Sequence, residues 1–383
     1  MDFPLVLAAV ILLVWLVIGQ EVFRGNRRLR WLGRLNAPAP VAWPKVSVVI
    51  AARNEAATIG AALPTILALD YPELEVIAVD DRSDDGTGEI LDRLAAANPR
   101  LRVLHEQTLP AGWIGKNHAL ADGAEQAAGD WILFTDADVH FQPDTLRRAV
   151  AYARAQTLDH LAAVPRLTEG GDWLGICVNA FSFVFTAGIR PWKIPDPRSR
   201  AHGGVGAFNL VRTATYRKLG GHVPIHLRPD DDIKLGKLMK SGGFSEFVLG
   251  AGALSVAWYP SVKEMIRGLE KNAYAGADYR FWLPPLGAAV TLLAYLWPFA
   301  GVILCAGPAR WCYLAVIGVM LALGCDQVRF AGGRRWWHGL FLPVGVAAFS
   351  YMLLRSQFIT HARGGITWRG TFYPLRELKE NRL

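Results

Sequence analysis

Three clusters of aspartate residues are the groups in this chain whose type and spacing could do chemistry. They are Asp80 with Asp81, Asp136 with Asp138, and Asp230 to Asp232. Carboxylates are costly to gather unless they share a cation, hold a polar ligand or exchange a proton. The three clusters together therefore predict a metal-dependent site for a phosphorylated substrate.

The first cluster directly follows the apolar run VIAV, so its side chains are expected at the carboxyl end of a strand. An aspartate at that place can accept a hydrogen bond from a nucleobase imide or a ribose hydroxyl. Capping of the next helix or turn by Asp81, Ser83 and Asp85 accounts for the same residues equally well. Both interpretations stay open at this point.

The second cluster ends the segment WILFTDAD. On an extended chain, alternate positions place the carboxylates of Asp136 and Asp138 on one side. Mg²⁺ and Mn²⁺ prefer oxygen ligands and usually keep waters and substrate phosphates, so a sparse protein site is expected. Such a cation would neutralise a leaving diphosphate. We therefore expect Mg²⁺ or Mn²⁺ as the cofactor.

The third cluster precedes a segment with the apolar spacing of a helix, IKLGKLM. One of its carboxylates could take a proton from an acceptor hydroxyl, although helix capping explains at least one of the three. Lys116 follows a glycine-bearing loop and is a candidate phosphate contact. The loop lacks the P-loop spacing, which disfavours ATP hydrolysis. His202, beside Gly203, Gly204 and Gly206, is a weaker candidate.

The elements that position these residues begin near residue 45 with KVSVVIAARNE, which is typical of a buried strand that ends in a polar turn. Strands and helices then alternate through LEVIAVDD, residues 88–97, residues 101–105, residues 117–128 and WILFTDAD. This alternation predicts an α/β fold with a parallel sheet. Ligands collect at the carboxyl ends of strands in such sheets, where the first two clusters are expected.

Composition points to a membrane. Of the 383 residues, 52% are hydrophobic and 14 are Trp, which is too apolar for a wholly soluble protein. The net charge of +8 comes from basic residues beside apolar segments. Anionic lipid and membrane topology explain that placement, so nucleic acid is not expected as a partner. The spacing of the four Cys residues favours neither a disulfide framework nor a zinc site.

The hydrophobic pattern predicts a domain order. We expect an N-terminal transmembrane anchor in residues 1–22, favoured over a cleaved signal peptide, and a basic, proline-containing linker in residues 23–44. A catalytic domain in residues 45–282 follows, with 173–193 as an interfacial helix or, alternatively, a buried core helix. Residues 283–358 hold three transmembrane helices, near 284–306, 311–328 and 337–358, before a basic tail in 359–383.

Basic residues also predict the orientation. Those after the first apolar run place the next domain in the cytoplasm, and the loop 329–335 should be cytoplasmic as well. Simple alternation of three helices then leaves the basic tail outside, against the same rule. One segment could be re-entrant, so the orientation of the tail stays open.

The motifs SVVIAARNE, VDDRSDDGT, the DAD after an apolar strand, GAFNLVRTATYRKLGGH and PDDDIKLGKLMKSGG resemble those of glycosyltransferase family 2. The resemblance covers residues 45–276 and implies a GT-A type (Rossmann-like) α/β fold, a nucleotide-sugar donor and a divalent metal. The single N-terminal anchor and the C-terminal helices resemble the branches of ceramide glucosyltransferase and of hopanoid-associated and carotenoid-acid glycosyltransferases. These branches act on lipids.

The resemblance implies roles one residue at a time. Asp81, beside Asp80, matches the aspartate that reads uracil. Asp136 and Asp138 match the metal and diphosphate pair. Asp232 matches the catalytic base, and Asp231 takes the place of the glutamate before it. The remaining matches are the nucleoside contacts Ala52, Arg53, Asn54 and Glu55, and, where the family's (Q/R)xxRW motif is missing, Arg267, Lys271 and Asn272.

These observations lead to a functional expectation. We expect an inverting, metal-dependent glycosyltransferase of the cell membrane, with a cytoplasmic catalytic domain. It would move a sugar from a nucleotide-sugar donor, a UDP-sugar being favoured, to a lipid acceptor. The alternatives are a processive polysaccharide synthase and a non-catalytic membrane scaffold derived from a transferase.

Overall fold

The computed structural model describes residues 3–168, 170–333, 335–381 and 383. The chain forms two compact units. The sheet unit comprises Leu29–Arg166, Pro191–Ala257 and Glu380–Leu383. The helical unit comprises Met1–Arg28, Leu167–Arg190 and Trp258–Lys379. Each unit is described by itself.

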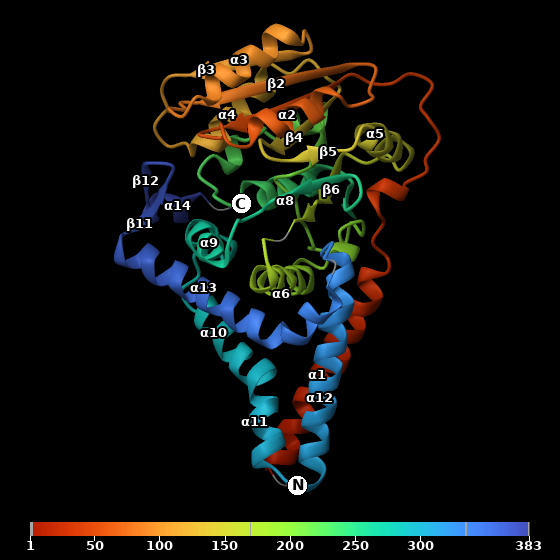
Figure 1. Ribbon diagram of the computed structural model, residues 1–383, viewed down its shortest axis with the longest axis vertical. Coiled ribbons are helices and arrows are strands. Elements are labelled where there is room, and N and C mark those ends of the chain that lie inside the picture. The colour runs from red at the N-terminus through yellow and green to blue at the C-terminus, as the bar shows by residue number, and fades with distance from the viewer. Residues whose placement is uncertain (1–2, 169, 334, 382) are drawn as a thin grey trace. The chain divides into compact units, whose positions relative to one another are not determined.

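A seven-stranded sheet forms the centre of the sheet unit, with strand order β3-β2-β1-β4-β8-β6-β9 (Figure 1). Its strands are rich in Val, Ile, Leu and Ala, which suit a sheet that is buried on both faces. Their bounds are β1 Val46–Ala52, β2 Leu74–Asp81, β3 Leu101–Glu106, β4 Trp131–Asp136, β6 His160–Val164, β8 Asn209–Arg212 and β9 Ser245–Leu249. Strand β8 runs antiparallel to β4 and β6, so the sheet is mixed rather than wholly parallel as predicted.

Helices between the strands complete the α/β alternation. They are α2 Ile59–Leu67, α3 Thr87–Ala97, α4 Gly115–Glu125, α5 Thr145–Ala155, α7 Thr213–Lys218 and α8 Asp231–Gly242. Shorter elements are the 3-10 turns Leu32–Arg34, Pro191–Lys193 and Val223–Ile225, the strand pair β5 His140–Phe141 and β10 Leu254–Val256, and β7 Arg166–Leu167 where the chain passes between units.

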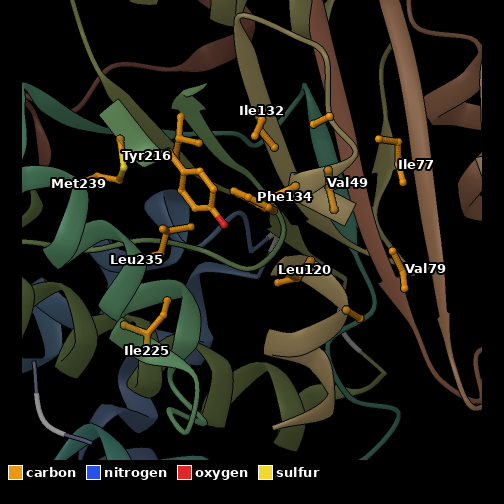
Figure 2. Close-up of a cluster of buried hydrophobic side chains, with 14 residues drawn as sticks. Val49, Ile77, Val79, Leu120, Ile132, Phe134, Tyr216, Ile225, Leu235 and Met239 are labelled. Carbon is orange, nitrogen blue, oxygen red and sulfur yellow. The ribbon is translucent and has the colours of Figure 1, made fainter. Parts of the chain in front are cut away.

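One apolar cluster fixes the two helices that carry site residues. Leu120 of α4 packs with Val49 and Val79 of the sheet, and Leu235 of α8 packs near Phe134 of β4 (Figure 2). All of these side chains are almost fully buried. The core therefore sets the position of the first turns of α4 and α8 relative to the sheet.

The segment WILFTDAD departs from its prediction in one respect. Strand β4 ends at Asp136, and Ala137 and Asp138 lie in a turn. The argument that an extended chain places both carboxylates on one side is therefore wrong for this pair. Any approach of the two side chains depends on the turn instead.

The helical unit consists mainly of long helices (Figure 1). Their bounds are α1 Phe3–Asn26, α6 Asp172–Ile189, α9 Val262–Gly276, α10 Leu283–Val290, a π-helical turn Thr291–Leu296, α11 Trp297–Leu304, α12 Gly307–Phe330, the 3-10 helix Trp336–Phe341 and α13 Leu342–Ala362. A hairpin of β11 Gly365–Trp368 and β12 Thr371–Pro374 follows, and then α14 Leu375–Glu380.

Five helical segments of the described residues are long and apolar enough to cross a membrane. They are Phe3–Asn26, Asp172–Lys193, Leu283–Leu304, Gly307–Phe330 and Trp336–Ala362. Four of them coincide with the predicted anchor and the three predicted C-terminal helices. The fifth, which contains α6, covers the segment predicted as interfacial, and length and composition do not decide between these two roles.

Candidate active site

The register of the sheet brings the first two aspartate clusters to one edge. Ala51 of β1 pairs with Asp136 of β4, and Ala52 pairs with Asp80 of β2. The strands β1, β2 and β4 are parallel to one another, so their carboxyl ends meet at this edge. The arrangement follows from strand order and pairing, because the paired residues lie far apart in the sequence.

Lys116 stands between the second and third clusters. Its Nζ lies 2.9 Å from Asp136 Oδ1 and 3.3 Å from Asp231 Oδ2. Burial alone would lower the pKa of this lysine, but the carboxylates of Asp136, Asp231 and Asp232 outweigh it and raise the pKa above its ordinary value. Lys116 is therefore a permanent cation that compensates acidic groups from two separate elements.

These residues surround one small cavity. The cavity is lined by Lys116, Leu120, Phe134, Thr135, Asp136, Gly206, Asn209, His222, Asp231, Asp232 and Leu235. Its walls come from β4, β8, the first turns of α4 and α8, and the loops before β8 and after α7. Asp136 of the second cluster and Asp231 and Asp232 of the third thus converge with the lysine, whereas Asp138 and Asp230 are not among the lining residues.

Asp232 is held by backbone donors. Its Oδ2 accepts from the Gly206 N–H at 2.9 Å and its Oδ1 accepts from the Ile233 N–H at 2.8 Å. Burial, with the neighbouring Asp231 adding to it, raises the pKa of Asp232 to about 7. Burial likewise raises the pKa of Asp231. A carboxylate whose pKa lies near neutrality is suited to take up a proton.

Glycines explain how the loop before β8 comes so close to these carboxylates. A Cβ on Gly204 would collide with the carbonyl oxygen of Asp232, and a Cβ on Gly206 would press on the carboxylate of Asp136. A Cβ on Gly236 of α8 would collide with the carbonyl of Gly203. The run HGGVG is thus required for close backbone approach. His202 itself bonds to the Arg200 carbonyl and is not among the residues that line the cavity.

Asp230 differs from its two neighbours. Its carboxylate receives two hydrogen bonds, at 2.8 and 2.9 Å, from the guanidinium of Arg228, a side chain with no exposed surface. Lys234 Nζ lies 3.7 Å away on the next turn of α8. Asp230 therefore stabilises the start of α8, and its side chain makes no capping hydrogen bond of the kind considered for this cluster.

The first cluster shapes a loop pair at the ends of β1 and β2. Asp80 accepts from the Ser83 N–H at 3.2 Å and lies 3.1 Å from His105 Nδ1. Asp81 pairs with Arg82 at 2.7 Å and lies 3.7 Å from Arg53. A Cβ on Gly115 would collide with the Asp81 carboxylate, so Asp81 lies against the residue before Lys116.

The segment after β1 is tied to the segment after β2. The Asn54 N–H donates to Ser83 Oγ at 3.0 Å, and Asn54 Oδ1 accepts from the Asp84 N–H at 3.0 Å. The Glu55 N–H donates to Thr87 Oγ1 at 2.8 Å. Asn54 adopts a φ of 55°, a left-handed conformation that asparagine tolerates better than most residues. Ala52, Arg53, Asn54 and Glu55 therefore form one cross-linked wall with the first cluster.

The raised pKa of Asp138 indicates whether a divalent cation suits this site. Burial, together with the charges of Asp136 and Glu55, raises the pKa of Asp138 to about 7. A carboxyl group whose pKa is raised by neighbouring carboxylates gains from a shared cation. Among the described residues, no group of three or more His, Cys, Asp and Glu side chains forms a closed metal site. Asp136 and Asp138 thus fit a sparse site whose shell substrate phosphates complete.

The sequence analysis missed His222, which lines the same cavity. Its Nδ1 lies 2.6 Å from the hydroxyl of Tyr216, and its ring packs on Phe134. Burial, with the nearby charge of Lys116, lowers the pKa of His222 to about 3, so the ring is neutral. A histidine after two glycines carries no local signal that it lines a cavity. Only its contact with Phe134 shows this placement.

Arg267, Lys271 and Asn272 belong to α9 of the helical unit, whereas all other candidates belong to the sheet unit. Arg267 forms an ion pair with Glu264 at 3.0 Å, and Lys271 Nζ lies 4.4 Å from the ring centre of Trp368. Their predicted contact with a diphosphate stays a prediction.

The fold and the site define the class of the sheet unit. A mixed α/β sheet with acidic residues at the carboxyl ends of its strands is the arrangement of a GT-A-like domain. The family model described as glycosyl transferase family 2 matches residues 47–193. The chain therefore carries a glycosyltransferase family 2 domain, as its motifs predicted.

Two curated relatives are similar over part of the chain. A β-monoglucosyldiacylglycerol synthase of Synechocystis sp. is 34% identical over 157 residues, which cover 39% of this chain and 32% of the relative. The succinoglycan biosynthesis protein ExoO of Rhizobium meliloti is 36% identical over 121 residues, which cover 32% of this chain and 33% of the relative. The matches thus span about a third of each relative's length.

A solved structure is similar over nearly the whole chain. It is a mannosyltransferase from Pyrobaculum calidifontis in complex with GDP-Man and Mn²⁺, with a TM-score of 0.55 and 21% identity. The alignment covers 92% of this chain and 99% of that chain. At this identity the likeness shows the fold alone.

Proposed function

We propose that the protein is a membrane-bound, inverting glycosyltransferase that transfers a sugar from a nucleotide-sugar donor, with a UDP-sugar favoured, to a lipid acceptor. The observation that carries the proposal is the convergence of Asp136, Asp231 and Asp232 on Lys116 in a family 2 domain. The similarity to a glycolipid synthase supports the lipid acceptor, and the apolar helices support membrane attachment. We place the enzyme in the cell membrane with its sheet unit in the cytoplasm.

The donor would lie along the edge formed by β1, β2 and β4. The wall of Ala52 to Glu55, with Asp80 and Asp81, offers carboxylates and amides that suit the hydrogen-bonding groups of a nucleoside. Lys116, whose Nζ lies 2.9 Å from Asp136 and which follows the Gly115 that lies against Asp81, would contact the diphosphate. When the donor binds, its phosphate oxygens would replace the carboxylates of Asp136 and Asp231 as ion-pair partners of Lys116.

Asp136 and Asp138 would hold Mg²⁺ or Mn²⁺. The mutual repulsion of the two carboxylates supports this assignment. When bound, the cation supplies positive charge that stabilises the leaving diphosphate. The arginine and lysine of α9 are further candidates for that diphosphate, as the sequence predicts.

Asp232 would act as the base. Its carboxylate accepts the proton of the acceptor hydroxyl, and the hydroxyl oxygen attacks the anomeric carbon on the face opposite the diphosphate. The new carbon–oxygen bond forms as the bond from the anomeric carbon to the phosphate oxygen breaks, and the electron pair leaves with the nucleoside diphosphate. The backbone donors at Gly206 and Ile233 orient the carboxylate. Asp231 positions Lys116.

Calorimetric titration of the purified protein with UDP tests the donor and metal roles together. We expect Mn²⁺ to tighten UDP binding at least about tenfold in the native protein, because a cation held by Asp136 and Asp138 would offset the negative charge of the diphosphate. Asp138→Ala should abolish that gain. Asp144→Ala removes a half-exposed carboxylate at the start of α5, outside the cavity, and should keep it.

Three outcomes contradict parts of the proposal. UDP affinity that is the same with and without Mn²⁺ in the native protein removes the metal role. Absence of any nucleotide binding favours the scaffold over the enzyme. Long polymer rather than glycolipid in membranes that contain the protein would favour the polysaccharide synthase.

A further inference from the structure

We propose that α6 and α13 lie within one leaflet, against its anionic headgroups, and that neither crosses the bilayer. Three segments then cross it: α1, α10 with α11, and α12. The tail after α13 stays on the same side of the membrane as the sheet unit. The inference rests on the membrane attachment in the proposed function.

Contacts between the crossing segments define the direction in which each segment runs. Helices α1 and α12 run parallel, since Asn26 donates to Gln327 at 2.8 Å at one end and Gly19 packs on Val319 and Leu323 further along. Arg27 of α1 pairs with Asp326 of α12 at 2.8 Å. We call this end, where Arg24, Arg27, Arg28 and Arg329 gather, the basic end.

The segment α10–α11 runs in the opposite direction. Trp297 donates to the hydroxyl of Tyr313 at 2.9 Å, so the end of this segment lies beside the start of α12. Trp15, in the middle of α1, donates to the carbonyl of Ala294, in the middle of the segment, at 2.9 Å. The start of α10 therefore lies at the basic end, and the turn around Ala306 lies at the opposite end.

Both ends of α6 are attached to the basic end. At its start, Asp172 pairs with Arg335 and lies 3.2 Å from His338, just after α12. After its last residue, Arg190 lies 3.9 Å from Glu21, near the end of α1. A helix that crossed the bilayer would hold these two charged residues at opposite faces. Helix α6 instead runs across the crossing helices (Figure 1).

Helix α13 follows the same course. Its first residue, Leu342, packs near Gly324, in the last two turns of α12. Near its end, Gln357 donates to the carbonyl of Phe281, just before α10. Between them, Ser350 bonds to Thr291 at 2.6 Å, about 12 Å along α10 from its start at 1.5 Å per residue. The middle of α13 therefore dips into the leaflet and its end returns to the basic end.

The charged residues of α9, which packs beside α13, support this depth of α13 in the leaflet. Helix α9 lies along α13: Arg355 pairs with Glu270 at 2.8 Å, and the Tyr274 N–H donates to Ser356 at 3.1 Å. Charged residues are spread over the first ten residues of α9, namely Lys263, Glu264, Arg267, Glu270 and Lys271. Burying this many charges in the hydrocarbon core would cost too much free energy. Helix α9 and the part of α13 beside it therefore lie at headgroup level.

This arrangement removes the conflict left by simple alternation. Arg329 and Arg335, on either side of the turn after α12, and the tail residues Arg363, Arg369, Arg376 and Lys379 then share one side, as the positive-inside rule requires. Chain continuity puts the sheet unit on that side as well, because it begins directly after Arg28. The apolar composition of α13 reflects one face packed on α6 and α9 and another facing acyl chains.

Labelling of single cysteines from either side of the membrane tests the inference. In a protein freed of Cys177, Cys305, Cys312 and Cys325, one cysteine is placed at an exposed site of the tail, by Glu377→Cys. Ala96→Cys on α3 marks the side of the sheet unit, and Ala306→Cys marks the opposite side. An impermeant maleimide is applied to intact cells and to inverted vesicles.

We expect Glu377→Cys to be labelled only in the preparation, intact cells or inverted vesicles, in which Ala96→Cys is labelled. Labelling together with Ala306→Cys would mean that α13 crosses, and would overturn the inference. Fusions after the last residue serve where the cysteine-free protein does not fold: green fluorescent protein should be fluorescent and alkaline phosphatase inactive, and the reverse result overturns the inference. None of these readouts depends on sugar transfer, so they fail separately from the proposed function.

Discussion

At the scale of single residues, the proposed function rests on an exchange of ion-pair partners around Lys116. The lysine neutralises Asp136 and Asp231 in the absence of substrate. Donor phosphates and a divalent cation offer these groups new partners of opposite charge. In the proposed function, the carboxylates would exchange Lys116 for these partners when the donor and the cation bind.

Removal of the lysine should leave the acidic groups without compensation. We expect Lys116→Met to lower the free energy of unfolding by about 2 kcal/mol, since charged contacts with the half-buried Asp136 and the buried Asp231 are lost. Thermal unfolding should show a Tm lower by about 5 °C. Lys218→Met, which removes an exposed lysine of α7, should leave Tm unchanged. Equal Tm values for the two variants would contradict the role of Lys116.

The raised pKa of Asp232 predicts a pH dependence. A base must be deprotonated, and the pKa of Asp232 lies at about 7, so the reactive form disappears as pH falls below that value. We expect kcat/KM to fall about tenfold per pH unit below about pH 7 and to level off above it. A rate profile measured from about pH 5 to about pH 8 checks this. A flat profile at saturating metal would contradict Asp232 as the base.

Sequence reasoning located acidic residues but not all of their surroundings. Asp80, Asp81 and Asp136 follow apolar runs, and strand ends are legible from such runs. The structural role of Asp230 depends on Arg228, whose burial has no local signal. His222 and Asn209 reach the cavity through the packing of β8 and the loop after α7, and such long-range packing leaves no spacing to read.

At the scale of elements, the glycine-rich loop before β8 controls how closely α8 approaches the sheet. Gly204→Ala would drive a Cβ into the backbone of Asp232. We expect it to destabilise the sheet unit by about 3 kcal/mol, as overpacking against backbone does. The measurement is thermal unfolding. The matched control is Gly60→Ala in α2, where a Cβ has room; it should be neutral or stabilising by up to about 1 kcal/mol.

One result would contradict this role of the glycine-rich loop. If Gly204→Ala unfolds at the same temperature as Gly60→Ala, close approach of the loop is not required. The prediction then fails for the element, and the glycines serve another purpose.

The elements of the sheet unit were largely predictable because their patterns are local. Apolar runs of five to eight residues identified β1, β2, β3 and β4, and their alternation with helices identified the α/β class. The antiparallel strand β8 was not predicted, since direction depends on the connection through the helical unit and not on composition. The end of β4 at Asp136 was missed because a turn can begin in a sequence that is also compatible with a strand.

At the scale of the whole molecule, two units would divide the work of the proposed membrane enzyme. The sheet unit carries the residues proposed to bind the donor, and the helical unit carries the apolar segments and the charged helix α9. Hydrophobicity predicted the long helices, but it could not distinguish crossing helices from those that lie in one leaflet. Ion pairs at both ends of α6 and the neighbours of α13 carry that information.

The proposed reaction has a direct test in sugar transfer to lipid. The purified protein is reconstituted in vesicles of extracted lipids with Mn²⁺ and labelled UDP-sugars, and lipid-linked sugar is identified by mass spectrometry. We predict transfer by the native protein, and a loss of about 100- to 10,000-fold in Asp232→Asn with UDP binding retained. A folded Asp232→Asn variant that transfers sugar at the native rate would contradict the account.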